Sequence, residues 1–315
     1  SHNVSLTLAG GSRTITATHN LGGGETGTSN AFTVNPGAAN KLAIHRQPSE
    51  TALAGLAFER QPIIHIQDAF GNHVTTHAAT EVTASIHTGS GQLQGTRTVT
   101  AVNGVATFSN LSHQTGETIT IRFTSSPVLT QVVSNPVDVY SGVPHALAIQ
   151  QQPSSTATAG QSFALQPVIR IIDDLGNLVI TDNTTQVTAS IHSGTGQLLG
   201  TRTVTAASGI ATFTNLAHQT AETITIRFTA SPALSEVTSG SILVNPGAAT
   251  LAVLSGPAST FAGEANSLFT IRTYDAFGNL APVSAETRFS PVTNSGSIGA
   301  QEVVFTPSVV IIPAG

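Results

Sequence analysis

The chain has 315 residues, of which 39% are hydrophobic and only 9% charged, with a formal net charge of −5. Charged residues are few, Lys41 is the only lysine, and the net negative charge is spread thinly, so no basic surface is expected to attract a nucleic acid backbone. The lack of cysteine excludes disulfides and thiolate metal sites. No apolar run approaches the ~20 residues that a membrane helix needs. We therefore expect no nucleic acid partner and no membrane span.

A repeat of about 105 residues organises the sequence. The segment Leu-Ala-Ile-His-Arg-Gln-Pro-Ser at 42–49 recurs in related form at 147–154, and more loosely at 251–257. A period this long indicates tandem domains. The predicted domain boundaries are 1–39, 40–143, 144–247 and 248–315, with the first and last segments each forming part of a domain.

Alternating apolar and polar residues predict β-strands within each repeat. At 118–123, Ile and Phe take every second position between Thr and Arg, and 223–228 repeats this pattern. Such alternation gives a strand one core face and one solvent face. Further strands are expected at 82–86, 97–100 and 105–108. About seven short strands per repeat predict an all-β chain of tandem immunoglobulin-like β-sandwiches, with a core of aliphatic residues and phenylalanine.

Short linkers containing proline separate the repeats. Val-Asn-Pro-Gly-Ala-Ala stands at 34–39 and again at 244–249, and 139–144 takes the same place between them. Such linkers leave little freedom, so we expect a semi-rigid rod. Tyr140 lies in one predicted linker and Tyr274 precedes a turn; with no Trp in the chain, exposed aromatic platforms for a ligand are scarce.

Together, the opening Leu-Ala-Ile-x-x-Gln-Pro-Ser, the motif Asp-x-x-Gly-Asn and the closing Val-Asn-Pro-Gly-Ala-Ala resemble the bacterial Ig-like tandem repeats of surface proteins, including stalk modules of the invasin and intimin type. The resemblance covers essentially the whole chain. It implies an extracellular structural protein that forms a rod or filament on a bacterial cell surface. The alternative is an adhesin stalk whose domains bind a surface glycan or a host protein receptor.

The two ends resemble complementary parts of one domain. Residues 1–39 match the closing strands of a repeat, whereas 248–315 begin like a repeat and stop before those strands. Either chains join head to tail as a homopolymer, with 1–39 completing a neighbour by strand complementation, or the chain is a window of a longer tandem protein. The expected interface residues are Ile15, Ala17, Phe32, Val34, Phe289, Val304, Phe305, Val310 and Ile312.

The Asp-x-x-Gly-Asn motifs offer the best candidate chemistry. Their carboxylates and amides, with one adjacent aspartate, are weak candidates for calcium ligands: Asp68, Asn72, Asp173, Asp174, Asn177, Asp275 and Asn279. A calcium site needs six or more oxygens, and each motif brings only one or two carboxylates. The motif is therefore interpreted first as a hairpin turn, with glycine at positive φ. No other cofactor is expected.

Eleven histidines raise the question of a transition metal. His113 and His218 occupy the same position in different repeats, as do His87 and His192, so these pairs cannot share an ion. We expect single histidines on loops and strand exteriors.

An enzyme is not expected either. No Gly-x-Ser-x-Gly nucleophile elbow is present, and the sparse acidic residues, such as Glu81, Glu117 and Glu222, are expected to sit in turns or alone. Asn3, Asn110 and Asn183 begin glycosylation sequons, which a bacterial setting leaves largely unused.

Overall fold

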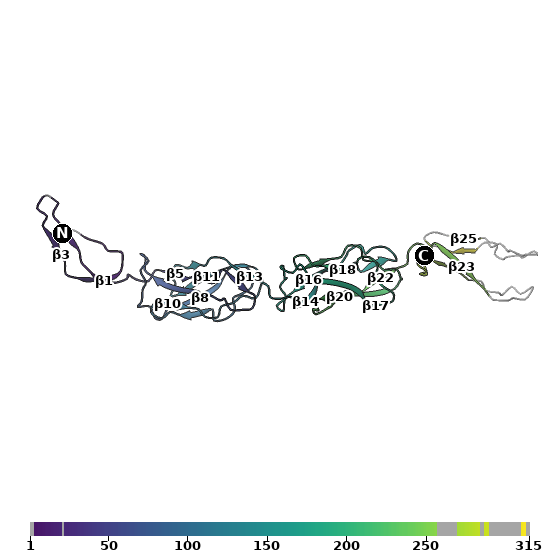
Figure 1. Ribbon diagram of the computed structural model, residues 1–315, viewed down its shortest axis with the longest axis horizontal. Coiled ribbons are helices and arrows are strands. Elements are labelled where there is room, and N and C mark those ends of the chain that lie inside the picture. Colours follow the sequence, from purple (N-terminus) through teal and green to yellow (C-terminus); the bar gives the residue numbers. More distant parts are fainter. Residues whose placement is uncertain (1–2, 21, 257–269, 284–286, 290–309, 313–315) are drawn as a thin grey trace, which may run out of the picture. The chain divides into compact units, whose positions relative to one another are not determined.

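A computed structural model describes residues 3–20, 22–256, 270–283, 287–289 and 310–312, and every regular element within them is a β-strand (Figure 1). By its internal contacts the chain divides into two units. The first contains residues 1–143 together with the turn at 173–178, and the second contains 144–172 and 179–315.

The first complete repeat consists of nine strands. They are β5 (Lys41–Arg46), β6 (Thr51–Leu53), β7 (Ile63–Gln67), β8 (Glu81–Thr88), β9 (Thr98–Thr100), β10 (Val105–Thr107), β11 (Thr118–Ser126), β12 (Val132–Val133) and β13 (Val137–Tyr140). The count exceeds the predicted seven because strands as short as β6 and β12 show no clear period of two. The predicted linker also begins inside a strand, since Tyr140 is the last residue of β13.

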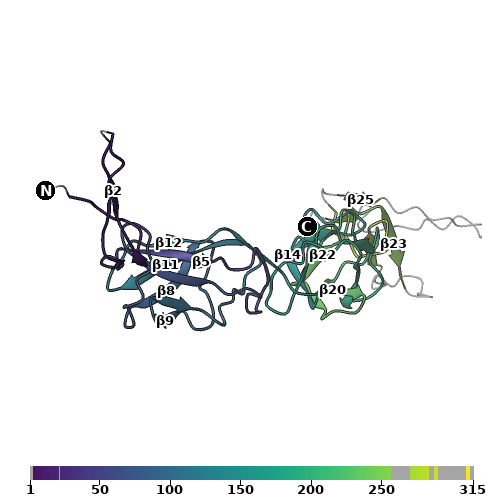
Figure 2. The same ribbon diagram turned by 60° about the vertical axis from the view of Figure 1, so that its left-hand side comes forward.

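Two sheets form the sandwich of this repeat. One has the order β10-β7-β5, and the other has the order β6-β13-β11-β8-β9 with β12 also paired to β11. Figure 2 shows β12, β11, β8 and β9 side by side. The first sheet corresponds to strands A, B and E of an immunoglobulin fold, and β13-β11-β8 corresponds to G-F-C. The prediction of an Ig-like, all-β chain is confirmed.

The core lies between these two sheets. Ile64 and Ile66 of β7 face it from one sheet, and Ile121 and Phe123 of β11 from the other, all fully buried. The rings of Phe108 and Phe123 lie 5.5 Å apart and tilted by 51°. Burying these apolar surfaces is the main stabilising contribution, at about 25 cal/mol per Å². The predicted alternation in β11 and the phenylalanine core are both confirmed.

The second complete repeat has the same construction. Its strands are β14 (Ala146–Gln151), β15 (Thr156–Thr158), β16 (Val168–Ile172), β17 (Gln186–Ser193), β18 (Thr203–Thr205), β19 (Ile210–Thr212), β20 (Thr223–Ser231), β21 (Val237–Thr238) and β22 (Ile242–Asn245). The sheet orders β14-β16-β19 and β15-β22-β20-β17-β18 match those of the first repeat, with β21 on β20. Phe213 and Phe228 form the same ring contact at 5.6 Å.

Residues before the first repeat form two antiparallel pairs. β1 (Gly10–Arg13) pairs with β4 (Phe32–Val34), and β2 (Thr16–Thr18) pairs with β3 (Thr26–Thr28). Apart from a register shift between Gly10 and Arg13, the register repeats that of the closing strands of the second repeat. Arg13 opposite Phe32 corresponds to Ile224 opposite Ile242, and Ala17 opposite Gly27 corresponds to Phe228 opposite Val237.

After the second repeat the structure describes two further pairs. β23 (Leu251–Ser255) is antiparallel to β24 (Thr270–Tyr274), and β25 (Thr287–Phe289) to β26 (Val310–Ile312). No helix in the described parts of the chain is long and apolar enough to cross a membrane.

Candidate functional site at the repeat junctions

Each Asp-x-x-Gly-Asn turn is closed by its own aspartate. Asp68 follows β7, and its Oδ1 accepts hydrogen bonds from the backbone N–H groups of Phe70 and Asn72, both at 2.9 Å. Between these residues Gly71 has φ of +91°, a conformation that favours glycine. The turn that the motif predicts is therefore confirmed.

The second oxygen of each aspartate holds the linker. Asp68 Oδ2 accepts the Gly37 N–H at 2.9 Å and the Asn72 side-chain amide at 2.8 Å. The other two turns repeat the contact, with Gly142 donating to Asp173 and Gly247 donating to Asp275, each at 2.8 Å. Thus each linker glycine places its N–H on the aspartate of the turn that follows.

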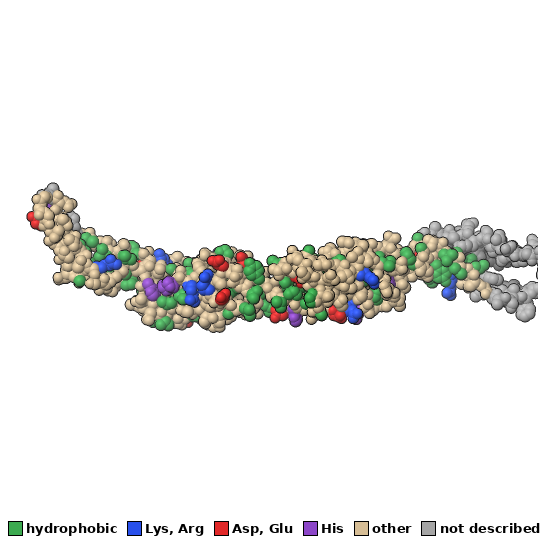
Figure 3. All heavy atoms as spheres, in the orientation of Figure 1, with side chains coloured by type: hydrophobic (Ala, Val, Ile, Leu, Met, Phe, Trp, Pro, Cys, Tyr) green, Lys and Arg blue, Asp and Glu red, His purple; other side chains and the backbone are tan. Residues whose placement is uncertain are grey.

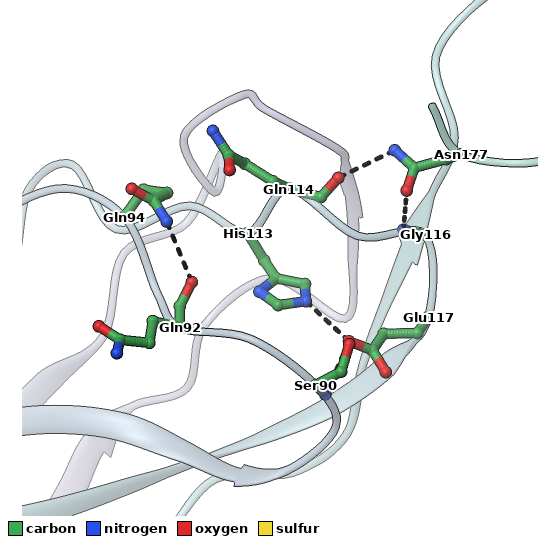
Figure 4. A network of polar contacts seen from close by, with 8 residues as sticks. All are labelled: Ser90, Gln92, Gln94, His113, Gln114, Gly116, Glu117 and Asn177. Atoms are coloured by element: carbon green, nitrogen blue, oxygen red, sulfur yellow. Dashed lines mark hydrogen bonds and ion pairs between the residues drawn. The ribbon is translucent and has the colours of Figure 1, made fainter. Parts of the chain in front are cut away.

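The asparagine of each turn makes a two-sided contact with backbone far away in sequence. Asn72 Nδ2 donates to the Thr7 carbonyl at 2.7 Å, and its Oδ1 accepts the Ala9 N–H at 2.9 Å. Figure 4 shows the equivalent contact in which Asn177 reaches the Gln114 carbonyl at 2.9 Å and the Gly116 N–H at 3.0 Å.

Asn279 repeats this arrangement within the second unit. It donates to the Gln219 carbonyl at 2.7 Å and accepts the Ala221 N–H at 2.8 Å. We name the three pairs Asp68/Asn72, Asp173/Asn177 and Asp275/Asn279 the Asp-Asn clamps. The sequence gives no sign of this role of the asparagines, because their partners are backbone groups that carry no side-chain signature.

Hydrogen bonds keep the clamp aspartates ionised. The Asn72 side-chain amide, with the N–H groups of Gly37, Asn72 and Phe70, lowers the pKa of Asp68 to about 2 against the opposing effect of burial. At Asp173 and Asp275 burial acts to raise the pKa, but the same set of N–H donors outweighs it and lowers the pKa. A charged acceptor makes these bonds stronger than neutral ones.

The calcium candidates occupy these clamps. Both oxygens of Asp68, Asp173 and Asp275 accept N–H groups, which a cation would have to displace. Asp174 is exposed beside its turn. Across the described residues, no group of three or more His, Asp or Glu side chains is arranged to hold a metal ion. The geometry therefore favours the turn over the calcium site.

The predicted interface residues of 1–39 are less covered than their counterparts. Ser29 N–H donates to the Ile15 carbonyl and its Oγ accepts the Ile15 N–H, as Ser239 does with Ile226. Ile15 is nevertheless 38% exposed, whereas Ile226 is fully buried. Phe32 and Val34 are half-buried and Ala17 is exposed, whereas their counterparts Ile242, Val244 and Phe228 are all buried.

Val4 shows the same contrast, and sequence analysis missed it. Val4 is 65% exposed, whereas Leu111 and Leu216 at the matching position are 0% exposed. The match could have been found from the two sequons. Asn3-Val4-Ser5 and Asn-Leu-Ser at 110–112 occupy the same position of the repeat, which aligns Val4 with Leu111. These apolar side chains of 1–39 are therefore less buried than their counterparts in the complete repeats.

The remaining predicted interface residues lie near the other end of the chain. Val304 and Phe305 fall outside the described residues. Phe289, Val310 and Ile312 belong to the β25·β26 pair, in which Phe289 lies opposite Val310.

Two histidines correct the sequence analysis. His113 and His218 were expected on exteriors, yet each is 1% exposed. Nε2 of His113 donates a hydrogen bond to the Glu117 carboxylate at 2.9 Å. The same carboxylate accepts hydrogen bonds from the backbone N–H and the hydroxyl group of Ser90, and Figure 4 shows the three residues together. His218 and Glu222 repeat the pair at 3.1 Å, so these glutamates do not stand alone. The sequence hides this because partners four residues apart in a loop follow no strand period.

A second group of histidines belongs to the first repeat alone. His45, His65 and His73 stack with ring centroids 4.1 and 4.4 Å apart. Burial, with the nearby His45 and His73, lowers the pKa of His65. Figure 3 shows purple histidine atoms gathered near β5 and β10, with blue Lys or Arg atoms beside them. Parallel stacked rings do not converge on one ion.

No family model matches the chain, and no curated protein matches it. Among solved structures, invasin, a bacterial integrin-binding protein, is 13% identical, with 98% of this chain and 67% of that chain covered and a TM-score of 0.32. An intimin fragment in complex with its translocated receptor is 14% identical, covering 70% and 67%, with a TM-score of 0.25.

A β-glycosidase from Bacteroides vulgatus is 12% identical, with a TM-score of 0.29, and covers 66% of this chain. The match covers 25% of the length of the glycosidase. Likenesses at these identities and TM-scores do not transfer a function.

Proposed function

We propose that this chain is an extracellular structural protein whose tandem Ig-like sandwiches form a rod or filament on a bacterial surface. In this proposal residues 1–39 close a sandwich whose opening strands come from 248–315 of a neighbouring copy, or from a preceding repeat in a continuous tandem chain. The role is mechanical, with no catalytic step.

The contrast in burial carries this proposal. Val4, Ile15 and Phe32 sit at positions that are core in both complete repeats, and here they are partly exposed. The backbone pairing of 1–39 already has the register of closing strands. A complementary half would cover these side chains and supply the missing strands through ladder hydrogen bonds.

The Asp-Asn clamps support the mechanical role. Three times along the chain, a turn of one repeat holds the preceding linker and the backbone beyond it through the same hydrogen bonds. A contact repeated at each junction is what a stalk needs in order to limit bending between its repeats. We propose that the clamps have this task.

Light scattering and negative-stain microscopy of the purified chain test strand exchange. We expect head-to-tail polymers whose mass grows with concentration. Phe32→Asp should abolish them, because the closing strand would carry a charge into the core. Thr33→Asp is the matched control, since Thr33 is exposed on the same strand. Deletion of 1–39 should also abolish assembly.

A chain that stays monomeric at every concentration would contradict exchange between copies. The continuous form is then tested in a fusion of two full copies in one polypeptide. The internal copy of 1–39 should show slow hydrogen exchange at the Ile15 amide, while the N-terminal copy exchanges fast.

The histidine stack favours an adhesin as the second candidate. In the second repeat the matching positions hold Gln150, Arg170 and Leu178, so the stack is special to the first repeat. The double substitution His45→Gln and His65→Arg installs the residues of the second repeat. An adhesin that uses this face would lose binding to immobilised glycans or host cells, with unchanged thermal unfolding.

A further inference from the structure

Four charged side chains line one open cleft of the first repeat. The cleft has a volume of about 480 Å³, within the range of small-ligand sites, and lies where β5 ends. This group stands out because only 9% of the residues in the chain are charged. The lining residues are Arg46, Ser49, Glu50, Glu59 and Arg60, and we name them the Arg-Glu cleft.

Backbone carbonyls hold both arginines of the Arg-Glu cleft in place. Arg46 Nε donates to the Gln61 carbonyl at 2.9 Å. Arg60 donates from Nε to the Gln47 carbonyl at 3.1 Å and from Nη2 to the Pro48 carbonyl at 3.2 Å. A guanidinium group carries five N–H donors, so each arginine keeps several of them for another acceptor.

The anchor of Arg46 is itself fixed by the core. Gln61 is buried, and its Nε2 donates to the Phe58 carbonyl at 2.8 Å and to the Leu111 carbonyl at 3.0 Å. Its Oε1 accepts the Leu111 N–H at 2.9 Å. A positive charge held by such an anchor loses little freedom when a ligand binds, which favours affinity.

The glutamates of the cleft leave these arginines without a counterion. Glu50 and Glu59 are exposed, and in the described parts of the chain no ion pair joins either of them to an arginine. Carboxylates only accept hydrogen bonds, and guanidinium groups only donate them. A ligand that satisfies both must therefore present an anionic acceptor together with hydroxyl or amine donors.

The second repeat shows that the sandwich does not need these charges. Gln151 keeps the backbone contact of its counterpart, because its Nε2 donates to the Gln166 carbonyl at 2.7 Å. The Ser154 N–H donates to the Leu165 carbonyl at 3.1 Å, so the two segments still pair. Stability of the fold thus does not explain the four charges. The residues that replace Arg46, Glu50, Glu59 and Arg60 are Gln151, Ser155, Ala164 and Leu165.

We propose that the Arg-Glu cleft binds an acidic saccharide. The carboxylate of the sugar lies against the guanidinium groups of Arg46 and Arg60, and its hydroxyl groups donate to Glu50 and Glu59. An open cleft suits a saccharide, because the rest of a glycan can continue past the bound sugar. The inference does not rest on head-to-tail assembly, since every residue of the cleft belongs to one repeat, and it involves none of the stacked histidines.

Calorimetric titration of the full chain tests the ligand class. The probes are 3′-sialyllactose and trigalacturonate, which both carry carboxylates on sugars. Lactose is the matched neutral control, and a polyglutamate peptide carries carboxylates without hydroxyl groups. We expect binding of at least one acidic sugar, with roughly tenfold weaker binding, or less, of lactose and of the peptide. Binding of neither acidic sugar, or equal binding of lactose or the peptide, would overturn the proposal.

Exchange of the arginines for the residues of the second repeat tests the site. In Arg46→Gln with Arg60→Leu the fold should persist, because the second repeat forms with these residues. The affinity for the acidic sugar should fall roughly tenfold or more, since its carboxylate loses charge-assisted donors. Arg97→Gln is the control, because Arg97 is exposed in the same repeat and does not line the cleft. Unchanged affinity of the double variant, or an equal loss in Arg97→Gln, would contradict the assignment.

Transfer of the cleft to the second repeat is the positive test. The altered chain should bind two saccharides per monomer where the wild type binds one, as the calorimetric stoichiometry reports. A stoichiometry that stays at one would overturn the assignment of these side chains as the site. The four substitutions are Gln151→Arg, Ser155→Glu, Ala164→Glu and Leu165→Arg.

Discussion

Residues 1–39 share the backbone pairing of the closing strands and carry apolar residues at Val4, Ile15, Phe32 and Val34, but only the complete repeats bury these positions. Ser29 holds Ile15 through the hydrogen bonds with which Ser239 holds Ile226. The backbone ladder of the closing strands therefore forms from their own sequence. Burial in a complete repeat also needs the earlier strands, because β5 and β7 belong to the facing sheet and β8 pairs directly with β11.

The two complete repeats provide the reference for this comparison. Their cores share the same positions, and the paired rings Phe108–Phe123 and Phe213–Phe228 agree to within 0.1 Å in separation. Between the two repeats surface residues change freely, as the replacement of His65 by Arg170 shows. Ile15 is an isoleucine like its counterparts Ile121 and Ile226, so its greater exposure does not come from a change of side chain.

The largest expected effect contrasts Ile121 with Ile15. Ile121→Ala should destabilise the first repeat by about 2–5 kcal/mol, because it removes a fully buried side chain and leaves a cavity. Ile15→Ala in the unassembled chain should cost less than about 1 kcal/mol, since the side chain is already partly in water. Hydrogen exchange resolved by segment is the measurement, because a chain of several domains does not unfold in two states.

Assembled material gives a sharper test of the comparison between Ile15→Ala and Ile121→Ala. There Ile15→Ala should approach the cost of Ile121→Ala as its strand gains a cover. Equal and small effects of Ile15→Ala in both states would mean that no complementary half binds, and the comparison with complete repeats would fail.

The clamp asparagines give the next effect. Asn177→Ala removes two hydrogen bonds to backbone groups and should weaken local stability at its junction by about 1–2 kcal/mol. The Gly116 amide loses its acceptor, so its hydrogen exchange should speed up roughly tenfold, while amides of β11 keep their protection. Gln94→Ala is a matched control, because Gln94 is an exposed side chain on a nearby loop (Figure 4). Slower exchange at Gly116, or general loss of protection in β11, would contradict the local role.

Much of the fold could be predicted from the sequence, because strands with one buried face carry a period of two. Ile119, Ile121 and Phe123 were predicted inward and are fully buried. The turn at Asp68 was predicted as well, since its bonds join residues within four positions. Local chemistry of this kind is legible in one sequence.

The candidate site could be predicted less well, because its side chains bind backbone groups that are far away in the sequence. Asn72 reaches a carbonyl 65 positions away, and any residue type can offer a carbonyl. His113 was wrongly expected outside, because a loop histidine gives no sign that a glutamate and a tight turn enclose it. The contact between Leu175 and Gly55 could not be predicted for a similar reason, because the two residues stand in different repeats of the sequence.

The smallest expected effect is the response of a clamp to acid. The pKa of Asp68 is lowered to about 2, below the value near 3.9 of an unfolded chain, by bonds led by the Asn72 amide. A group with a depressed pKa adds stability above its unfolded pKa and loses this contribution as the pH falls through its folded pKa. The Asp68 clamp should therefore be intact above about pH 4 and weaken as the pH falls to about 2.

The amide of Gly37 reports this titration directly, since it donates to Asp68 Oδ2. Its chemical shift in a pH series should move with a midpoint near 2 and stay flat from pH 4 to 7. In Asp68→Asn the movement should vanish, because no carboxylate titrates there. A midpoint near 4 would show an ordinary carboxyl group without the four N–H donors. In that case an ionised Asp68 would not hold the linker at Gly37, and the clamp would lack its charged acceptor.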